Sequence, residues 1–129
     1  LEDGLLIPVL HDAGSMPLAD LAAEAKALVQ RARAGRPKGD DLIGATFNIS
    51  NVGPFNVESF SAIVFPGQGA VLAVSGIHEE AVAKAGQMYP AQVMRFTLSA
   101  DHRVIDGVVA AQFLTELTKI IENPVLLLA

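Results

Sequence analysis

The stretch Ser99–Gly107 constrains the fold of this chain more than any other. It joins an alternating β-forming segment, residues 91–100, to an amphipathic segment that begins after Asp106. Asp106 can accept hydrogen bonds from the free N–H groups that open a helix. His102 is the one side chain in the stretch whose ordinary pKa lies near neutrality, which suits it to proton transfer. The stretch therefore predicts a strand-to-helix junction that carries either a proton-transferring histidine or a structural one.

Two long segments have helical periodicity. Apolar residues recur at three- and four-residue spacings from Leu18 to Ala32, and again from Val108 to Ile121. The first pattern predicts a helix that is capped by Ser15 and ends at about Ala34. The second predicts a helix from Asp106 to about Glu122.

The remaining apolar runs have the length and residue types of strands. They lie at residues 5–10, 45–50, 69–76 and 91–100. Pro8 places the first run at a sheet edge, because proline cannot donate to a ladder of hydrogen bonds. Residues 77–86 give no clear periodicity, and we expect His78 there to lie in a solvated turn. These elements together predict a mixed α/β domain, with a mixed sheet and helices on one face.

Composition and charge narrow the possible functions. Hydrophobic residues make up 51% and charged residues 18% of the 129 residues, which favours surface buried in an oligomer or a small alanine-rich core. The net charge of −5, with no basic cluster, argues against nucleic acid and against anionic membrane surfaces. The absence of cysteine excludes a disulfide, a thiolate nucleophile and a thiolate metal site. No apolar run is long enough to span a bilayer.

Two motifs resemble one known family. Residues 101–107, Asp-His-Arg-x-x-Asp-Gly, resemble the signature of the catalytic domain of dihydrolipoamide acyltransferases, the core component of the 2-oxoacid dehydrogenase complexes. The shorter His-x-x-x-Asp-Gly is also found in chloramphenicol acetyltransferases. Residues 46–53 resemble the acyltransferase pattern Thr-Phe-x-Ile-Ser-Asn-x-Gly. Further matches at residues 3–9 and 122–124 extend the resemblance nearly from end to end.

The resemblance implies that residues 1–129 are the C-terminal half of this catalytic domain. Leu1 falls near the middle of the family's domain, so we expect the first half to lie upstream. Neither a lipoyl domain nor a peripheral subunit-binding domain is expected within residues 1–129. The implied fold is the chloramphenicol acetyltransferase-like two-layer sandwich, incomplete on its N-terminal side and therefore with an exposed sheet edge.

The implied reaction moves an acyl group between dihydrolipoamide and coenzyme A. A free thiol has a pKa of about 8.5 and histidine of about 6.5, so neutral His102 can take the proton as the thiol attacks the thioester. The hydroxyl of Ser50 is the candidate donor to the oxyanion that forms. Asp106 supports the loop by capping the helix or by pairing with an arginine. Coenzyme A acts as a substrate, the lipoyl group is carried on a separate domain, and no metal is expected.

Other residues are candidates for binding and assembly. Asn51, Gly53 and Arg103 are candidates for substrate contact, the first two because they shape the turn after Ser50. The C-terminal leucines are candidates for oligomer contact, namely Leu126, Leu127 and Leu128. Burying each of them stabilises a contact by roughly 1.5–3 kcal/mol. In the family, the C-terminal residues hook adjacent trimers together.

The resemblance also implies partners and a location. The chain is expected to form a homotrimer that assembles into a cubic or dodecahedral core, with His102 of one subunit close to Ser50 of the next. The lipoyl domain and the dehydrogenase components of the complex are the other expected partners, and neither nucleic acid nor a membrane is expected. The location is the cytoplasm in a bacterium or the mitochondrial matrix in a eukaryote.

At this point the sequence leaves two other functions possible. It also leaves open which acyl group is transferred. One alternative is a non-catalytic core or adaptor protein of the same fold, and the other is a coenzyme A-dependent xenobiotic O-acetyltransferase. Residues 99–107 are most similar to branched-chain enzymes. Residues 60–63 are more similar to the acetyl-transferring enzymes of pyruvate dehydrogenase complexes.

Overall fold

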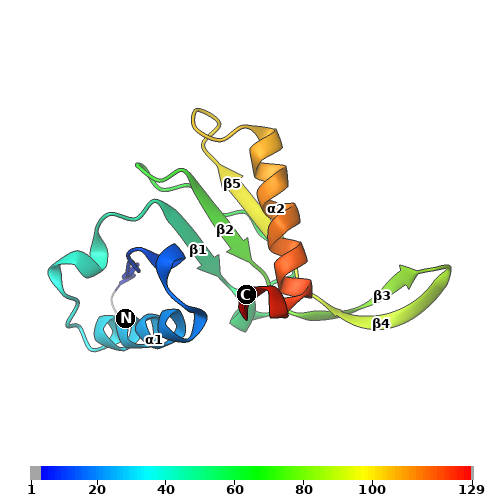
Figure 1. The fold of residues 1–129 in the computed structure, drawn as a ribbon, viewed down its shortest axis with the longest axis horizontal. Coiled ribbons are helices and arrows are strands. Elements are labelled where there is room, and N and C mark those ends of the chain that lie inside the picture. The colour runs from blue at the N-terminus through cyan, green and yellow to red at the C-terminus, as the bar shows by residue number, and fades with distance from the viewer. Residues whose placement is uncertain (1–3, 129) are drawn as a thin grey trace. The chain divides into compact units, whose positions relative to one another are not determined.

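The computed structural model describes residues 4–128 of the chain (Figure 1). The chain separates into two compact units. One is Thr46–Lys119, which holds the sheet and the motifs discussed above, and the other is formed by the residues on either side of it. No helix among the described residues is long and apolar enough to cross a membrane.

A three-stranded mixed sheet forms the centre of the first unit. Its strands are β1 (Phe47–Asn51), β2 (Ala70–Val74) and β5 (Phe96–Ala100), in the order β1-β2-β5. β1 runs parallel to β2, and β5 runs antiparallel to it. The central strand β2 is the core of this unit, since Ala70, Val71 and Ala73 are each 1% exposed. Within residues 4–128, β1 and β5 each pair on one side only, which leaves an outer edge on both.

One face of this sheet is packed against α2 (Gly107–Glu122) (Figure 1). The rings of Phe47 on β1 and Phe113 on α2 have centroids 5.6 Å apart. The predicted second helix and the mixed α/β sheet with a helix on one face are therefore confirmed.

A long hairpin leaves the sheet between β2 and β5 (Figure 1). It consists of β3 (His78–Lys84) and β4 (Gln87–Val93), paired antiparallel. The single strand expected over residues 91–100 is wrong, because the chain leaves β4 at Val93 before it enters β5 at Phe96. The solvated turn expected around His78 is also wrong. His78 is half-buried at the first position of β3, and its Nε2 is a buried atom without a partner among the described residues.

The second unit contains the other long helix, α1 (Leu18–Arg33). The helix is confirmed, but Ser15 does not cap it: Pro17 occupies the N-cap position, and the Ser15 hydroxyl donates to the carbonyl of Asp12. The strand expected over residues 5–10 is wrong, because these residues have no ladder partner within the described part of the chain. Their one backbone bond there is from Val9 N–H to the carbonyl of Asp41.

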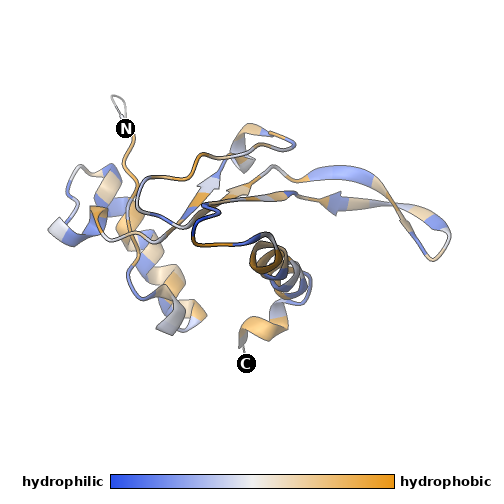
Figure 2. Cartoon of the chain, turned by 90° about the horizontal axis from the view of Figure 1, so that it is seen from above, coloured by the Kyte–Doolittle hydropathy of each residue, from blue (hydrophilic) through white to orange (hydrophobic). Residues whose placement is uncertain are grey.

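The C-terminal residues form a short 3₁₀-helix, Pro124–Leu128. Its sequence is hydrophobic, as the orange colour of this segment near the C-terminus in Figure 2 shows. Val125 is 75% exposed, and Leu126 and Leu127 are 47% exposed each. The side chain of Leu128, the third predicted oligomer contact, lies outside the described residues.

Candidate functional site

Ser50 lies at the carboxyl end of β1, just before a tight turn. The turn begins where Val52 N–H donates to the carbonyl of Val74 at 3.2 Å. It is closed by the Asn51 side chain, whose Oδ1 accepts the N–H of Gly53 at 2.8 Å. Ser50 is half-buried, and its hydroxyl has no partner among residues 4–128. A serine hydroxyl in this state is free to donate to another group.

Gly53 is closely approached by its neighbours, so a larger residue would have to displace them slightly. A Cβ at this position would lie 3.0 Å from Asn51 Oδ1 and 3.1 Å from the carbonyl oxygen of Ser75. Asn51 and Gly53 also line a hollow of about 400 Å³ at the carboxyl ends of β1 and β2. The hollow is completed by apolar and uncharged polar residues, namely Pro54, Asn56, Val74, Ser75, Ile77 and Met94.

His102 lies on the turn that joins β5 to α2. The turn is attached to the sheet where Asp101 N–H donates to the carbonyl of Gly69 at 2.9 Å. It is closed by two further bonds, from Val104 N–H and Ile105 N–H to the carbonyl of Asp101, both of 3.0 Å. The His102 ring is exposed and has no partner among the described residues. The His102 ring is therefore not held by hydrogen bonds to the described residues, as the ring of a structural histidine would be.

Asp101 and Arg103, on either side of His102, are bound to each other. Arg103 Nη2 donates to Asp101 Oδ2 at 2.6 Å, and Arg103 Nε donates to Oδ1 at 2.9 Å. The main-chain N–H of Arg103 donates to the same Oδ1 at 3.0 Å. These hydrogen bonds from the Arg103 side chain and then from its backbone lower the pKa of Asp101 to about 2. The pKa of Arg103 is raised for the same reason.

Asp106 forms the start of α2. Its Oδ1 accepts the N–H groups of Val108 and Val109, both at 2.9 Å. These are two of the donors that the first turn of a helix leaves without a partner. The helix cap expected of Asp106 is therefore confirmed, while the neighbouring arginine, Arg103, pairs with Asp101 instead.

The structure does not bring Ser50 and His102 together within one chain. Ser50 pairs through Ala73 with Thr97, near the start of β5, while His102 follows Ala100 at the end of β5. Ala100 is level with Phe47, three residues before Ser50, which is about 10 Å along the strands at roughly 3.3 Å per residue. The two side chains lie at opposite ends of the sheet, so one chain alone cannot place both at one reacting group.

The family of the chain follows from its similarity to known proteins. A sequence profile described as "2-oxoacid dehydrogenases acyltransferase (catalytic domain)" matches residues 1–129. The chain belongs to this family.

Curated relatives of this acyltransferase-family chain come from bacteria and mitochondria. It is 38% identical over 128 residues to the dihydrolipoyllysine-residue acetyltransferase component of the Rickettsia bellii pyruvate dehydrogenase complex. It is 42% identical over 124 residues to the mitochondrial component of Schizosaccharomyces pombe. These matches cover 99% and 94% of the chain but only 31% and 26% of the relatives, so the chain spans about a third or less of their length.

Solved structures of the family share the fold of this chain. The cubic core of the pyruvate dehydrogenase multienzyme complex superimposes with a TM-score of 0.90 at 35% identity, over 98% of this chain and 52% of the other. The dihydrolipoamide acetyltransferase of Azotobacter vinelandii gives a TM-score of 0.89, also at 35% identity and with the same coverage. That structure belongs to a crystallographic and enzymatic study of one serine, one histidine and one asparagine in the catalytic mechanism.

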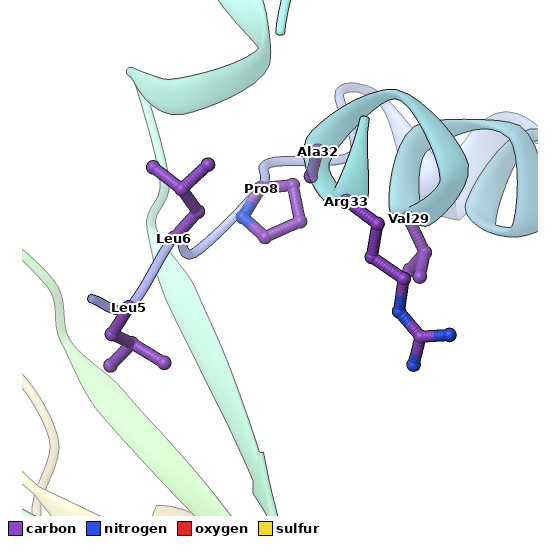
Figure 3. A pocket seen from close by; sticks show the side chains of 6 residues that line it. All are labelled: Leu5, Leu6, Pro8, Val29, Ala32 and Arg33. Atoms are coloured by element: carbon purple, nitrogen blue, oxygen red, sulfur yellow. The ribbon is translucent and has the colours of Figure 1, made fainter. Parts of the chain in front are cut away.

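A second pocket of this acyltransferase-family chain contains none of the candidate residues. It has a volume of about 220 Å³ and is formed by Leu5, Leu6 and Pro8 on one side and Val29, Ala32 and Arg33 of α1 on the other (Figure 3). Its lining is apolar except for Arg33, which offers no proton acceptor for chemistry. Among residues 4–128, no group of three or more metal-ligating side chains is close enough to hold an ion.

Asp101 was missed by the sequence reasoning as a residue with a role of its own. The signal was present, since a carboxylate and a guanidinium stand on either side of His102. Two residues that flank a turn position can meet when the turn closes, and arginine then binds a carboxylate through several donors at once.

Proposed function

We propose that this chain supplies part of the active site of a dihydrolipoamide acyltransferase within the core of a 2-oxoacid dehydrogenase complex. The observation that carries the proposal is that three residues of this chain have the same separations along the sequence as three residues of a related enzyme. The serine and histidine studied in the Azotobacter vinelandii enzyme are 52 residues apart, and the asparagine follows the histidine by four. Ser50, His102 and Asp106 have the same two spacings in this chain. Aspartate in place of asparagine keeps the side-chain oxygen that caps a helix.

His102 serves as the base in the proposed reaction. Its neutral imidazole takes the proton from the thiol of coenzyme A or of dihydrolipoamide, and the sulfur then bonds to the thioester carbonyl carbon. The first carbon–sulfur bond breaks as the intermediate collapses, and the proton passes to the departing sulfur. The exposure of His102 and the absence of a partner for its ring within residues 4–128 support this role.

Ser50 donates to the oxyanion of the tetrahedral intermediate. Its hydroxyl is half-buried at the end of β1 and has no partner among the described residues, so no internal bond must break before it donates. Ser50 borders the turn whose residues Asn51 and Gly53 line the 400 Å³ hollow. We place substrate contacts at Asn51 and Gly53. A further contact is placed at Nη1 of Arg103, the guanidinium nitrogen that has no bond to Asp101.

The active site forms between subunits of a homotrimer. The separation of Ser50 and His102 along the sheet supports this arrangement, since each residue then meets its counterpart from a neighbour. The exposed Leu126 and Leu127, with Leu128, are the proposed contacts through which trimers join into a larger core. The lipoyl domain and the dehydrogenase components are the remaining proposed partners, and residues 1–129 form the C-terminal half of the catalytic domain.

The experiment is an acyl-transfer assay on the full-length protein, with acetyl or branched-chain acyl coenzyme A and dihydrolipoamide. We expect transfer, and we expect His102→Ala to lower the rate by about 10²–10⁴-fold while the core still assembles. The matched control is His11→Ala, because His11 is also exposed but belongs to the other unit.

Each other outcome points to a different function. Full activity in the His102→Ala protein would refute the proposed base. Transfer to chloramphenicol but not to dihydrolipoamide would indicate a xenobiotic acetyltransferase. A wild-type protein that assembles and transfers to neither acceptor would indicate an adaptor.

A further inference from the structure

The ion pair between Asp101 and Arg103 joins the two residues on either side of His102. The two side chains are joined by hydrogen bonds of 2.6, 2.9 and 3.1 Å, and Arg103 N–H donates to the same carboxylate. His102 is the residue between them, so its backbone belongs to a small ring that is closed by the ion pair.

The loop of residues 101–103 that the ion pair closes is anchored to the rest of the unit through Asp101. The main chain of Asp101 donates to Gly69, next to the start of β2, and accepts from Val104 and Ile105. The Asp101 side chain is 23% exposed, whereas that of Arg103 is 88% exposed. Asp101 is therefore the fixed member of the pair, and Arg103 folds back onto it.

We propose that Asp101 and Arg103 act as a clamp that positions His102 and pairs the two charges on either side of it, so that neither charge acts alone on the imidazole. The importance of the clamp for catalysis rests on the proposed function, but its effect on His102 does not. Asp101 acts through His102 and is a positioning residue, and Arg103 has this role in addition to the substrate contact proposed for its Nη1.

The electrostatic part of the argument follows from the signs of the two charges. A free carboxylate beside an imidazole stabilises the protonated ring, and a free guanidinium destabilises it. An imidazole that is already protonated at neutral pH cannot accept the proton of a thiol. Because each charge of the clamp is paired with the other, the two effects on His102 largely cancel.

The other charged groups do not replace the clamp. Asp106, on the same turn, directs its Oδ1 to the first N–H groups of α2. The segment at Gly69, to which the turn is bonded, brings the uncharged Gln68. Arg95, with Glu58 and Glu80, lies before the opposite end of β5. On α2, Glu116 and Lys119 pair with each other more than two turns after Asp106.

The test measures the titration of His102 in the full-length protein without relying on turnover. Diethyl pyrocarbonate reacts with the neutral form of an imidazole and not with its protonated form. Its rate of reaction at a series of pH values, read on the His102 peptide by mass spectrometry, therefore gives the pKa of that ring. His11 and His78 are internal references in the same samples. The variants are Asp101→Asn, Arg103→Gln, the double variant, and Arg103→Lys.

The clamp predicts that the two single variants shift the pKa of His102 in opposite directions. Arg103→Gln frees the carboxylate and raises the pKa of His102 by about 0.3–1 unit, and Asp101→Asn frees the guanidinium and lowers it by a similar amount. The double variant returns the pKa close to that of the wild type. Single variants with the wild-type pKa, or with shifts of the same sign, would overturn the electrostatic role.

The acyl-transfer assay tests separately whether the clamp positions His102. Arg103→Lys keeps the charge but not the planar fork that binds both carboxylate oxygens. Compared with Arg103→Gln, we expect it to return the pKa of His102 toward the wild-type value, but to leave kcat below that of the wild type. Wild-type kcat in both Arg103→Lys and the double variant would overturn the positioning role.

Glu80→Gln is the matched control for the variants of the clamp. Glu80→Gln breaks a similar bidentate pair with Arg95, whose bonds are 2.7 and 3.0 Å, and should leave the pKa of His102 unchanged. If the wild-type protein transfers no acyl group, the proposed function fails, while the titration still decides whether the clamp sets the charge state of His102.

Discussion

Ser50 and His102 lie at opposite ends of one three-stranded sheet. Ser50 is close to the end of β1, level with the start of β5, and His102 follows the end of β5. Both belong to the same compact unit, so this separation is a property of the chain itself. A reaction that needs both side chains must therefore take one of them from another copy.

Mixing two inactive variants tests this arrangement directly. Full-length Ser50→Ala and His102→Ala proteins are each expected to be inactive, but a trimer that contains both can form a site with an intact serine and an intact histidine. Random assembly of equal amounts gives such a pair at about a quarter of the interfaces of a cyclic trimer. We expect about a quarter of the wild-type transfer rate after the subunits are dissociated and reassembled together. Activity no greater than that of the separate variants would contradict a shared site.

Ser50→Ala alone should affect the reaction more than the binding of substrate. Loss of one oxyanion donor typically lowers kcat by about 10²–10³-fold, while KM changes little because the donor acts on the intermediate. Steady-state kinetics with dihydrolipoamide measure both constants. Ser15→Ala is the control, since its hydroxyl serves only a local bond to Asp12 in the other unit. A change confined to KM would assign Ser50 to ground-state binding instead.

The cap formed by Asp106 predicts a difference between two substitutions. Alanine removes the acceptor for Val108 N–H and Val109 N–H, which costs about 0.5–2 kcal/mol at an N-cap. Asparagine keeps an oxygen in the same place and should retain most of that stability. Urea unfolding of the full-length variants compares the two free energies of unfolding. Equal losses for Asp106→Ala and Asp106→Asn would indicate that the negative charge of Asp106, and not its cap, is what matters.

The junction between β5 and α2 was predictable because its signals are local. Asp106 is followed by residues with helical periodicity, and its cap depends on the two N–H groups that come next in the chain. The buried strand β2 was predictable for a similar reason, since four consecutive apolar residues, from Val71 to Val74, favour burial on both faces.

The hairpin was not predictable from the same kind of signal. Its turn uses Ala85 and Gly86, both with positive φ, of 53° and 78°. Alanine rarely adopts this conformation, so Ala85-Gly86 lacks the Asn-Gly or Asp-Gly pattern that usually predicts such a turn. The distance between Ser50 and His102 was equally hidden, because it depends on which strands pair and in which direction, and not on either motif.

The interactions of Asp41 predict that the second unit loses folding stability as the pH falls. Its carboxylate binds the Arg31 side chain through two bonds of 3.0 Å and accepts the N–H of Lys38 at 2.8 Å. These bonds, first those of Arg31, lower the pKa of Asp41 to about 2, below the ordinary value of about 3.9. Because the pKa is depressed in the folded state, the stabilisation is complete above about pH 4 and is lost as the pH falls toward 2.

The measurement is the thermal unfolding midpoint of the full-length protein and of its Asp41→Asn variant between pH 7 and pH 3. We expect the variant to unfold several degrees below the wild type at pH 7, and the two midpoints to converge as the pH falls below about 4. Asp12→Asn is the control, because asparagine tolerates the left-handed conformation of Asp12, with φ of 50°. A difference between wild type and Asp41→Asn that stays constant down to pH 3 would show that Asp41 contributes by its shape and not by its charge.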